Sequence, residues 1–145
     1  MTTVTPLLPD DRAAWEELAR GYKAFYRTEV DDEGYARAWD RLLAGDEVHG
    51  LAARSDGVVV GIAHHLFHAN VWSGGACYLQ DLYVAEHARG LGAGRALIEA
   101  VADAARARGV ARLYWNTLHD NAAARALYDD VAVHRGFLVY EYPIA

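Results

Sequence analysis

The stretch CYLQDLYVAEHARGLGAGRALIEAV, residues 77–101, decides the fold predicted for this chain. It opens with aromatic and aliphatic residues interrupted only by Gln80 and Asp81, which is typical of a buried strand. A glycine-rich corner follows at residues 89–95. Beyond it, apolar residues recur at the spacing of an amphipathic helix: Leu97, Ile98, Val101 and Ala105. The stretch therefore predicts a strand, a tight turn and a helix.

The glycine-rich corner has the features of an anion site. A helix N-terminus leaves backbone N–H groups without partners and carries the positive end of the helix dipole, and glycines let a ligand approach the backbone closely. Arg89 and Arg95 flank this corner, so it predicts a pyrophosphate site. It matches neither the P-loop run G-x-x-x-x-G-K-[ST] nor the dinucleotide fingerprint, whose third glycine would fall at Arg95.

Two runs resemble the signatures of a known family. Arg89-x-x-Gly92-x-Gly94, after a strand that ends at 82–84, resembles the acetyl-CoA signature of the GNAT N-acetyltransferases. Asn121-x-x-Ala124-x-x-Leu127-Tyr128 resembles the downstream signature of that family, and the matches together cover roughly residues 78–137. The resemblance implies an α/β fold: a mixed, mostly antiparallel sheet flanked by helices on both faces. Its element order is β-α-α-β-β-β-α-β-α-β, in a single domain 1–145.

The resemblance also implies acetyl-CoA as co-substrate and no metal. In that family the central strand splays from the strand after the long helix, and the coenzyme wedges between them. We expect the splay near residues 82–84, with a bulge. The residues implied to contact the coenzyme come from the strand end, the corner and the second signature: Leu82, Tyr83, Val84, Arg89, Gly90, Leu91, Gly92, Ala93, Gly94, Arg95, Asn121, Ala124 and Tyr128.

Two side chains are predicted to carry the chemistry. Tyr128 falls on the family's general-acid tyrosine, which protonates the leaving thiolate; the alternative is an ordinary core tyrosine on an amphipathic helix. Asp81 is the ionisable candidate to take the proton of the amine, directly or through water, or else a structural carboxylate that caps loop amides. The resemblance assigns the polarisation of the thioester carbonyl to a backbone N–H of residues 82–84.

Residues 78–84 are also similar to the run Tyr-Leu-Glu-Asp-Phe-Phe-Val of the diamine (spermidine/spermine) acetyltransferases. There the glutamate aligned with Gln80 meets the substrate amine, whereas an amide cannot act as a base. Neighbouring strand residues point to opposite faces, so only one of Gln80 and Asp81 lines the site unless a bulge intervenes.

The acceptor wall is predicted to be aromatic. Tyr26 and Trp72 lie at element ends and suit an amine through cation–π contact, whereas Tyr22 and Phe25 are interpreted as core residues.

Three histidines at positions 64, 65 and 68 do not predict a metal site. On a strand His64 and His68 would lie about 13 Å apart, and His65 would point the other way. His65 is instead the histidine expected to face the acceptor groove.

The composition limits the classes of partner. The chain has 145 residues, 53% hydrophobic and 23% charged, as in a soluble globular protein. It has no apolar run of membrane length and no signal-peptide pattern, so neither a membrane nor secretion is expected. A single cysteine, Cys77, favours a cytoplasmic location. The net charge of −6 argues against nucleic acid and favours a cationic substrate.

The remaining elements follow from periodicity and turn signals. Helices are expected from Asp10 or Asp11 to about Tyr26, over 32–44 and over 120–133; strands are expected over 2–8, 48–54, 58–67, 110–117 and 137–143. Gly136 lies eight residues after Tyr128, where family members reach Gly-Phe after about four. The last helix is therefore expected to continue through 129–131 or to carry an extra turn.

The functional hypothesis is direct transfer of an acetyl group from acetyl-CoA to the primary amine of a small, polyamine- or amino-acid-like molecule. Two alternatives stay open: acetylation of a protein lysine or N-terminus, and a non-catalytic acyl-CoA-binding module. The resemblance adds a homodimer through the C-terminal strands as a further expectation.

Overall fold

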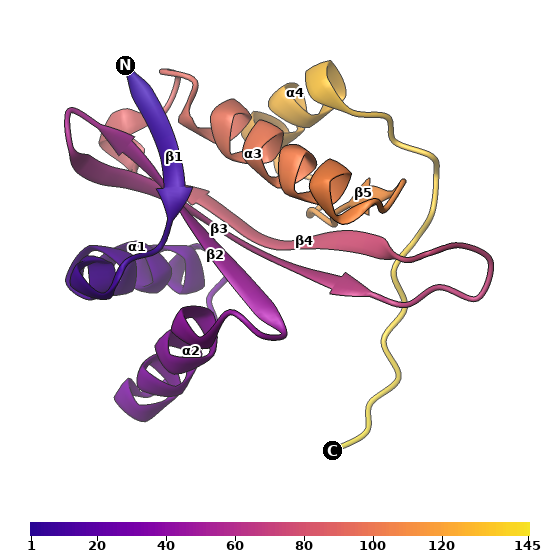
Figure 1. The fold of residues 1–145 in the computed structure, drawn as a ribbon, viewed down its shortest axis with the longest axis horizontal. Helices are drawn as coiled ribbons and strands as arrows, with labels where there is room; N and C mark the ends of the chain where they lie inside the picture. Colours follow the sequence, from indigo (N-terminus) through magenta and orange to yellow (C-terminus); the bar gives the residue numbers. More distant parts are fainter. The chain divides into compact units, whose positions relative to one another are not determined.

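The computed structural model describes residues 1–145 and contains one five-stranded sheet in the order β1-β2-β3-β4-β5 (Figure 1). The first four strands pair antiparallel, and β5 pairs with β4 in parallel. The predicted mixed, mostly antiparallel sheet is therefore confirmed. The strand bounds are β1 Thr2–Pro6, β2 Val48–Ser55, β3 Val58–His68, β4 Ala76–Val84 and β5 Leu113–Tyr114.

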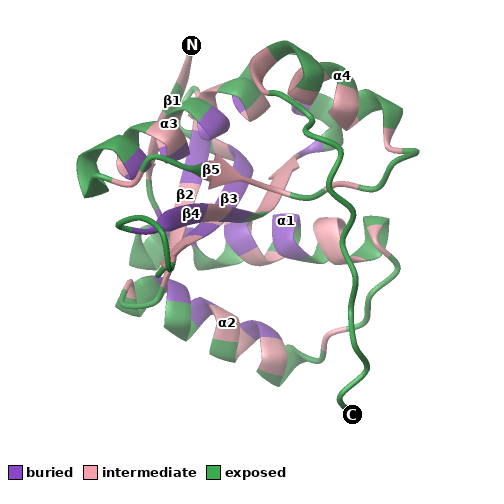
Figure 2. Ribbon diagram, turned by 90° about the vertical axis from the view of Figure 1, so that its right-hand side faces the viewer, coloured by how far each residue is buried: buried purple, intermediate pink, exposed green.

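Helices cover both faces of this sheet. α1 (Arg12–Phe25) contacts β3 and β4, α2 (Asp32–Ala44) contacts β2, and α3 (Ala93–Arg108) lies on the opposite face against β1 to β4 (Figure 1). Buried residues line the sheet and the inner sides of these helices (Figure 2). None of the helices combines the length and the apolar run needed to cross a membrane.

The chain divides into two compact units, residues 1–114 and 115–145. The first unit holds the sheet with α1, α2 and α3. The second holds α4 (Ala122–Val131), which continues past Tyr128 as expected.

The ends of α2 follow from its sequence. The Asp31 side chain accepts a hydrogen bond from the Gly34 N–H at 2.7 Å, and Gly45 ends the helix with a φ of 63°. The expected bounds 32–44 are confirmed.

The start of α1 differs from the expectation that Asp10 or Asp11 caps it. A short 3-10 turn, Pro9–Asp11, precedes the helix, and Asp11 makes no capping bond to it. Its carboxylate instead accepts the Leu8 N–H and pairs with the Arg54 guanidinium of β2 at 2.6 Å. The hydrogen bond from Arg54 lowers the pKa of this buried carboxyl below its usual value.

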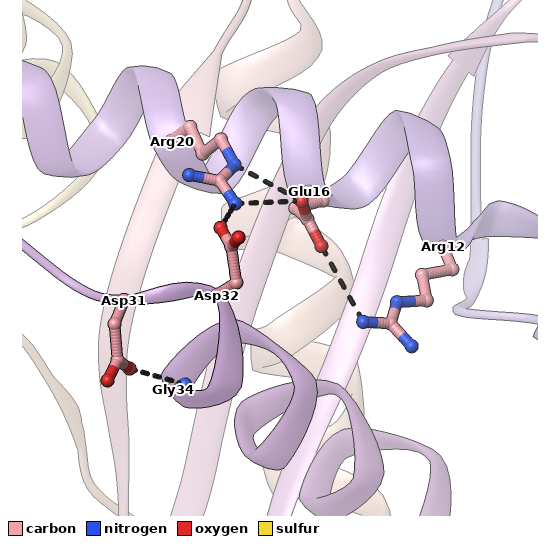
Figure 3. A network of polar contacts seen from close by, with 6 residues as sticks. All are labelled: Arg12, Glu16, Arg20, Asp31, Asp32 and Gly34. Atoms are coloured by element: carbon pink, nitrogen blue, oxygen red, sulfur yellow. Dashed lines mark hydrogen bonds and ion pairs between the residues drawn. The ribbon is translucent and has the colours of Figure 1, made fainter.

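An ionic network joins α1 to the start of α2 (Figure 3). Arg20 donates to Glu16 at 3.0 Å and to Asp32 at 2.7 Å, and its guanidinium lies 4.2 Å from the centre of the Tyr35 ring. The contacts of Arg20 with Asp32 and Tyr35 thus join the two helices on either side of the connection 26–31 directly to each other.

A bulge interrupts the pairing of β3 with β4. His64 pairs with Asp81 but His65 pairs with Leu79, so Gln80 has no partner on β3. Side chains alternate along a strand, so the extra residue Gln80 shifts this alternation. The odd-numbered residues of β4 after Gln80 therefore face the opposite side of the sheet from the odd-numbered residues before it. Cys77 and Leu79 share the α3 face with their partners on β3, whereas Asp81 lies on the α1 face with His64.

Two expected strands are shorter or absent. The strand expected over 110–117 forms only as Leu113–Tyr114. The strand expected over 137–143 does not form; its backbone pairs with no strand and its apolar side chains are exposed. A strand requires a hydrogen-bonded partner, which strand-favouring side chains alone do not supply.

On the α3 face, His65 is 4% exposed and its Nδ1 has no hydrogen-bond partner. Its ring stacks on His49 at 5.2 Å and meets Phe67 edge-on at 5.6 Å. Burial first, and then the neighbouring charge of His49, lowers the pKa of His65 from 6.5 to about 4.

His65 should therefore make the fold sensitive to acid. The unfolded chain binds this proton at a higher pH than the native protein does, so the free energy of unfolding falls as the pH drops from about 6.5 to about 4. The full loss from this group is about 3 kcal/mol. Urea unfolding across this range measures it.

We expect His65→Phe to remove most of this dependence, since a phenyl ring packs beside Phe67 without a proton to bind. The same change at His87, which is exposed, serves as the matched control and should leave the dependence unaltered. Equal slopes for the wild type and His65→Phe would contradict the assignment.

Candidate active site

Asp81 lies where the bulge turns β4 toward α1. The His64 Nδ1 is 2.8 Å from its Oδ2, and Tyr22 of α1 also hydrogen-bonds to the carboxylate. Burial alone would raise the pKa of Asp81, but the hydrogen bonds from His64 and Tyr22 and the charge of Lys23 outweigh it and lower the pKa. The site therefore holds a largely buried, ionised carboxylate.

The histidine beside Asp81 is not the one expected. His65 lies on the opposite face of the sheet, packed against His49 and Phe67, and does not reach Asp81. His64 takes this place because the offset at Gln80 pairs it with Asp81. Strand alternation separates His64 from His65, but no local signal in the sequence tells which of them meets the carboxylate.

The aromatic residues expected at the acceptor site divide into two groups. Tyr22 and Tyr26 lie together at the end of α1, with ring centres 4.9 Å apart, and Tyr22 also meets Tyr83 of β4 edge-on. Phe25 is 51% exposed, so its interpretation as a core residue was wrong. Trp72 is 93% exposed in the β3–β4 loop, which joins the end of β4 farthest from Val84.

An open pocket of about 1000 Å³ lies along the end of α1 and the start of α2. Its lining includes four cationic side chains, and two of them are engaged by carboxylates: Arg20 by Glu16 and Asp32, and Arg37 by Glu33. Lys23 both lines the pocket and acts on Asp81. The cationic lining residues are Arg20, Lys23, Arg27 and Arg37.

β4 has an open edge. It pairs with β5 only at Cys77 and Tyr78, and from Leu79 to Val84 its only strand partner is β3. The pairing of β4 with β5 thus ends at Tyr78, earlier along β4 than the expected 82–84. An unpaired edge of this kind offers N–H and C=O groups to an extended ligand.

The turn after β4 has the backbone of an anion site. Gly92 precedes α3 with a φ of 90°, no side chain caps the first turn of that helix, and a Cβ at Gly90 or Gly92 would meet nothing within 4 Å. Arg89 donates its Nε–H to the Val84 carbonyl at 3.1 Å and lies over the Tyr83 ring. This geometry fits a diphosphate at the α3 N-terminus. The other predicted corner residues belong to the turn or to the start of α3: Leu91, Ala93, Gly94 and Arg95.

The remaining predicted residues belong to the unit 115–145. The Asn121 side chain caps α4 by accepting the Ala124 N–H at 3.4 Å. Tyr128 is half-buried, and its ring meets Trp115 edge-on at 5.3 Å.

Cys77 is fully buried in β4. Burial raises the pKa of its thiol to about 11, so it stays protonated and shielded from solvent. No three histidine, cysteine or acidic side chains gather closely enough to hold a metal ion.

The sequence is similar to that of known acetyltransferases. Residues 14–132 match the family described as "Acetyltransferase (GNAT) family". The chain is 35% identical over 145 residues to the D-amino-acid N-acetyltransferase HPA3 of Saccharomyces cerevisiae, covering 95% of this chain and 88% of that protein. A thialysine N-epsilon-acetyltransferase of Caenorhabditis elegans is 34% identical over 84 residues, covering 58% of this chain and 52% of that protein.

Solved structures share the fold. The aminoglycoside N-acetyltransferase AAC(6')-Iy, in complex with a bisubstrate analogue, superposes with a TM-score of 0.87 at 18% identity, covering 100% of this chain and 99% of that one. A ribosomal-protein-alanine N-acetyltransferase from Brucella melitensis gives a TM-score of 0.82 at 24% identity, covering 99% of each chain.

Proposed function

The chain belongs to the acetyltransferase (GNAT) family, and from that premise we propose that it transfers the acetyl group of acetyl-CoA directly to the primary amine of a small molecule of the amino-acid type. The observation that carries this proposal is the ionised Asp81, held beside the open edge of β4. A buried carboxylate next to the place for a thioester suits a cationic acceptor.

The segment 79–95 would bind the coenzyme. The α3 N-terminus would hold the diphosphate, with Arg89 and Arg95 nearby, and the β4 edge would pair with the pantetheine arm. A backbone N–H of 82–84 would polarise the thioester carbonyl. When bound, acetyl-CoA supplies an activated acyl group; the chain's task is then to orient the acceptor and to manage protons.

Asp81 would anchor the acceptor's ammonium and take one of its protons, directly or through water, so that the neutral nitrogen can attack the thioester carbonyl. As the C–N bond forms and the C–S bond breaks, the nitrogen loses a second proton and the sulfur gains one. Its lowered pKa keeps it charged at neutral pH, which favours the anchoring role and makes it a weak base. Tyr128 would donate its hydroxyl proton to the departing sulfur, as the family signature implies.

The choice of an amino acid rests on two observations. Two of the relatives are named for activity on amino acids, D-amino acids and thialysine. In this chain Lys23 and Arg27 line the pocket at the end of α1, the charge of Lys23 also acts on Asp81, and cations in this pocket suit the acceptor's carboxylate.

Replacement of Gly92 by valine should weaken acetyl-CoA binding. A β-branched residue at a φ of 90° strains the turn, and its side chain would occupy the space proposed for the diphosphate. Calorimetry should show an affinity loss of about tenfold or more, the size of one lost charge-assisted contact.

Gly57→Val is the matched control. Gly57 has a φ of 81° and open space around it, but it lies in the β2–β3 hairpin. Both variants should lose about 1–2 kcal/mol of stability, and only Gly92→Val should lose affinity. Equal affinities would remove the α3 N-terminus from the coenzyme site.

Turnover is tested by release of free thiol from acetyl-CoA with a panel of D- and L-amino acids, thialysine, diamines and lysine peptides. We expect amino acids to be acetylated, with kcat/KM for the amine reduced about 100-fold or more by Asp81→Asn, and kcat reduced to a similar degree by Tyr128→Phe. The kinetics should be sequential, and Cys77→Ala should remain active because its buried thiol forms no acetyl-enzyme.

The panel also separates the alternatives. Preferential turnover of peptides would indicate a protein acetyltransferase. Tight acetyl-CoA binding without turnover of any amine would indicate an acyl-CoA-binding module.

A further inference from the structure

Three side chains from three elements form a continuous chain of hydrogen bonds that ends at Asp81. The Trp15 indole of α1 donates its Nε1–H to the Nε2 of His64 at 2.9 Å. The other ring nitrogen of His64, on β3, lies 2.8 Å from the Asp81 Oδ2 of β4.

The chemistry of the indole determines where the imidazole proton lies. An indole N–H can only donate, so the His64 Nε2 must accept and carries no hydrogen. The hydrogen of the neutral ring is then on Nδ1, which donates to Asp81. A protonated His64 would have no acceptor to offer Trp15.

The hydrophobic core holds this arrangement in place. Trp15 is 1% exposed and packs against Trp39 at 5.1 Å and Tyr35 at 6.4 Å, both on α2. The side chains of His64 and Asp81 are also largely covered. The indole therefore cannot turn away from His64 without disturbing the packing between α1 and α2.

We propose that Trp15 and His64 are positioning residues, which orient Asp81 and hold it as a carboxylate for the acceptor amine, and that His64 does not carry protons. This inference rests on the proposed function of Asp81. A relay through His64 would require its Nε2 to take up a proton, and the Trp15 N–H occupies that position. A proton taken by Asp81 from the amine must therefore leave by the acceptor side.

His64 on β3 and Tyr22 on α1 hydrogen-bond to Asp81, and Lys23 on α1 acts on it through its charge. His65 lies on the other face of the sheet. Without the hydrogen bond from His64, less remains to offset the effect of burial on Asp81, so the pKa of Asp81 should rise. Activity that requires the carboxylate should then be lost at a higher pH than in the wild type.

Two substitutions of His64 distinguish positioning from relay. His64→Asn keeps an N–H donor near the Nδ1 position but cannot transfer a proton, whereas His64→Leu removes both functions. We expect His64→Leu to lower kcat/KM for the amine about 10- to 100-fold and to move the acidic limb of its pH profile upward. His64→Asn should restore most of the lost kcat/KM and keep the acidic limb of the pH profile low. Because His64→Asn leaves the Trp15 indole N–H unpaired, the double variant Trp15→Phe/His64→Asn, which removes that N–H, is measured as well.

His68→Leu is the control on the same strand, because His68 bonds Tyr114 and not Asp81, and it should leave turnover unchanged. If His64→Asn is as inactive as His64→Leu, also with Trp15→Phe, the positioning role is overturned in favour of a relay. If neither substitution lowers kcat/KM, the contact has no catalytic role and the proposal also fails.

Nitrogen-15 NMR of the imidazole tests the geometry without any substrate. The spectrum should show the neutral His64 tautomer with hydrogen on Nδ1, and Trp15→Phe should abolish this preference. A spectrum with hydrogen on Nε2 in the wild type would overturn the inference even if the protein is an active acetyltransferase. Conversely, the expected tautomer with no turnover of any amine would refute the proposed function and leave the hydrogen-bond chain standing.

Discussion

The offset pairing of β3 with β4 is the constraint on which the site depends. Because Gln80 has no partner on β3, the side chains of the β4 residues after it point to the opposite face of the sheet from the one that a regular pairing would give them. Without this bulge Asp81 would face α3, on the side of the buried His65. With it, the carboxylate meets His64 from the neighbouring strand and Tyr22 from α1. A backbone irregularity thus determines which charges the carboxylate can balance.

The same strand supports both halves of the proposed reaction. One edge of β4 is open beyond Tyr78, and the turn that follows leads directly into the uncapped end of α3. Arg89 bonds back to Val84, so the turn is fastened to the strand that precedes it. A ligand that follows the strand edge into the turn would meet backbone donors from one continuous stretch of chain. In the proposed reaction the acceptor side would be formed by α1 and its connection to α2.

The sequence predicted the elements that have local signals. α2 carries its own cap at Asp31 and its own stop at Gly45, and the β2–β3 hairpin has its turn residues, so their bounds agree closely with the expected ones. Partners that lie far apart in the sequence were missed. Trp15 lies at helical spacing from Leu18 and Tyr22, a pattern that indicates burial, but the pattern does not indicate the bond that the Trp15 indole makes to His64, 49 residues later.

The expected final strand shows the same limit. The aromatic and aliphatic residues over 137–143 favour a strand, but strand formation depends on a backbone neighbour that no local pattern specifies. The prediction of His65 where the structure places His64 has a related cause. The register of β3 against β4 decides which histidine meets Asp81, and one unpaired residue changes that register.

The burial of Cys77 has a practical consequence. Its sulfur is buried on the α3 face of β4, as the only thiol of the molecule. An alkylating reagent can reach it only when the packing around this part of β4 opens, so the labelling rate of the native protein reports the free energy of that local opening. The protein thus carries a built-in, single-site probe of the opening of this part of its core, and needs no engineered label for that measurement.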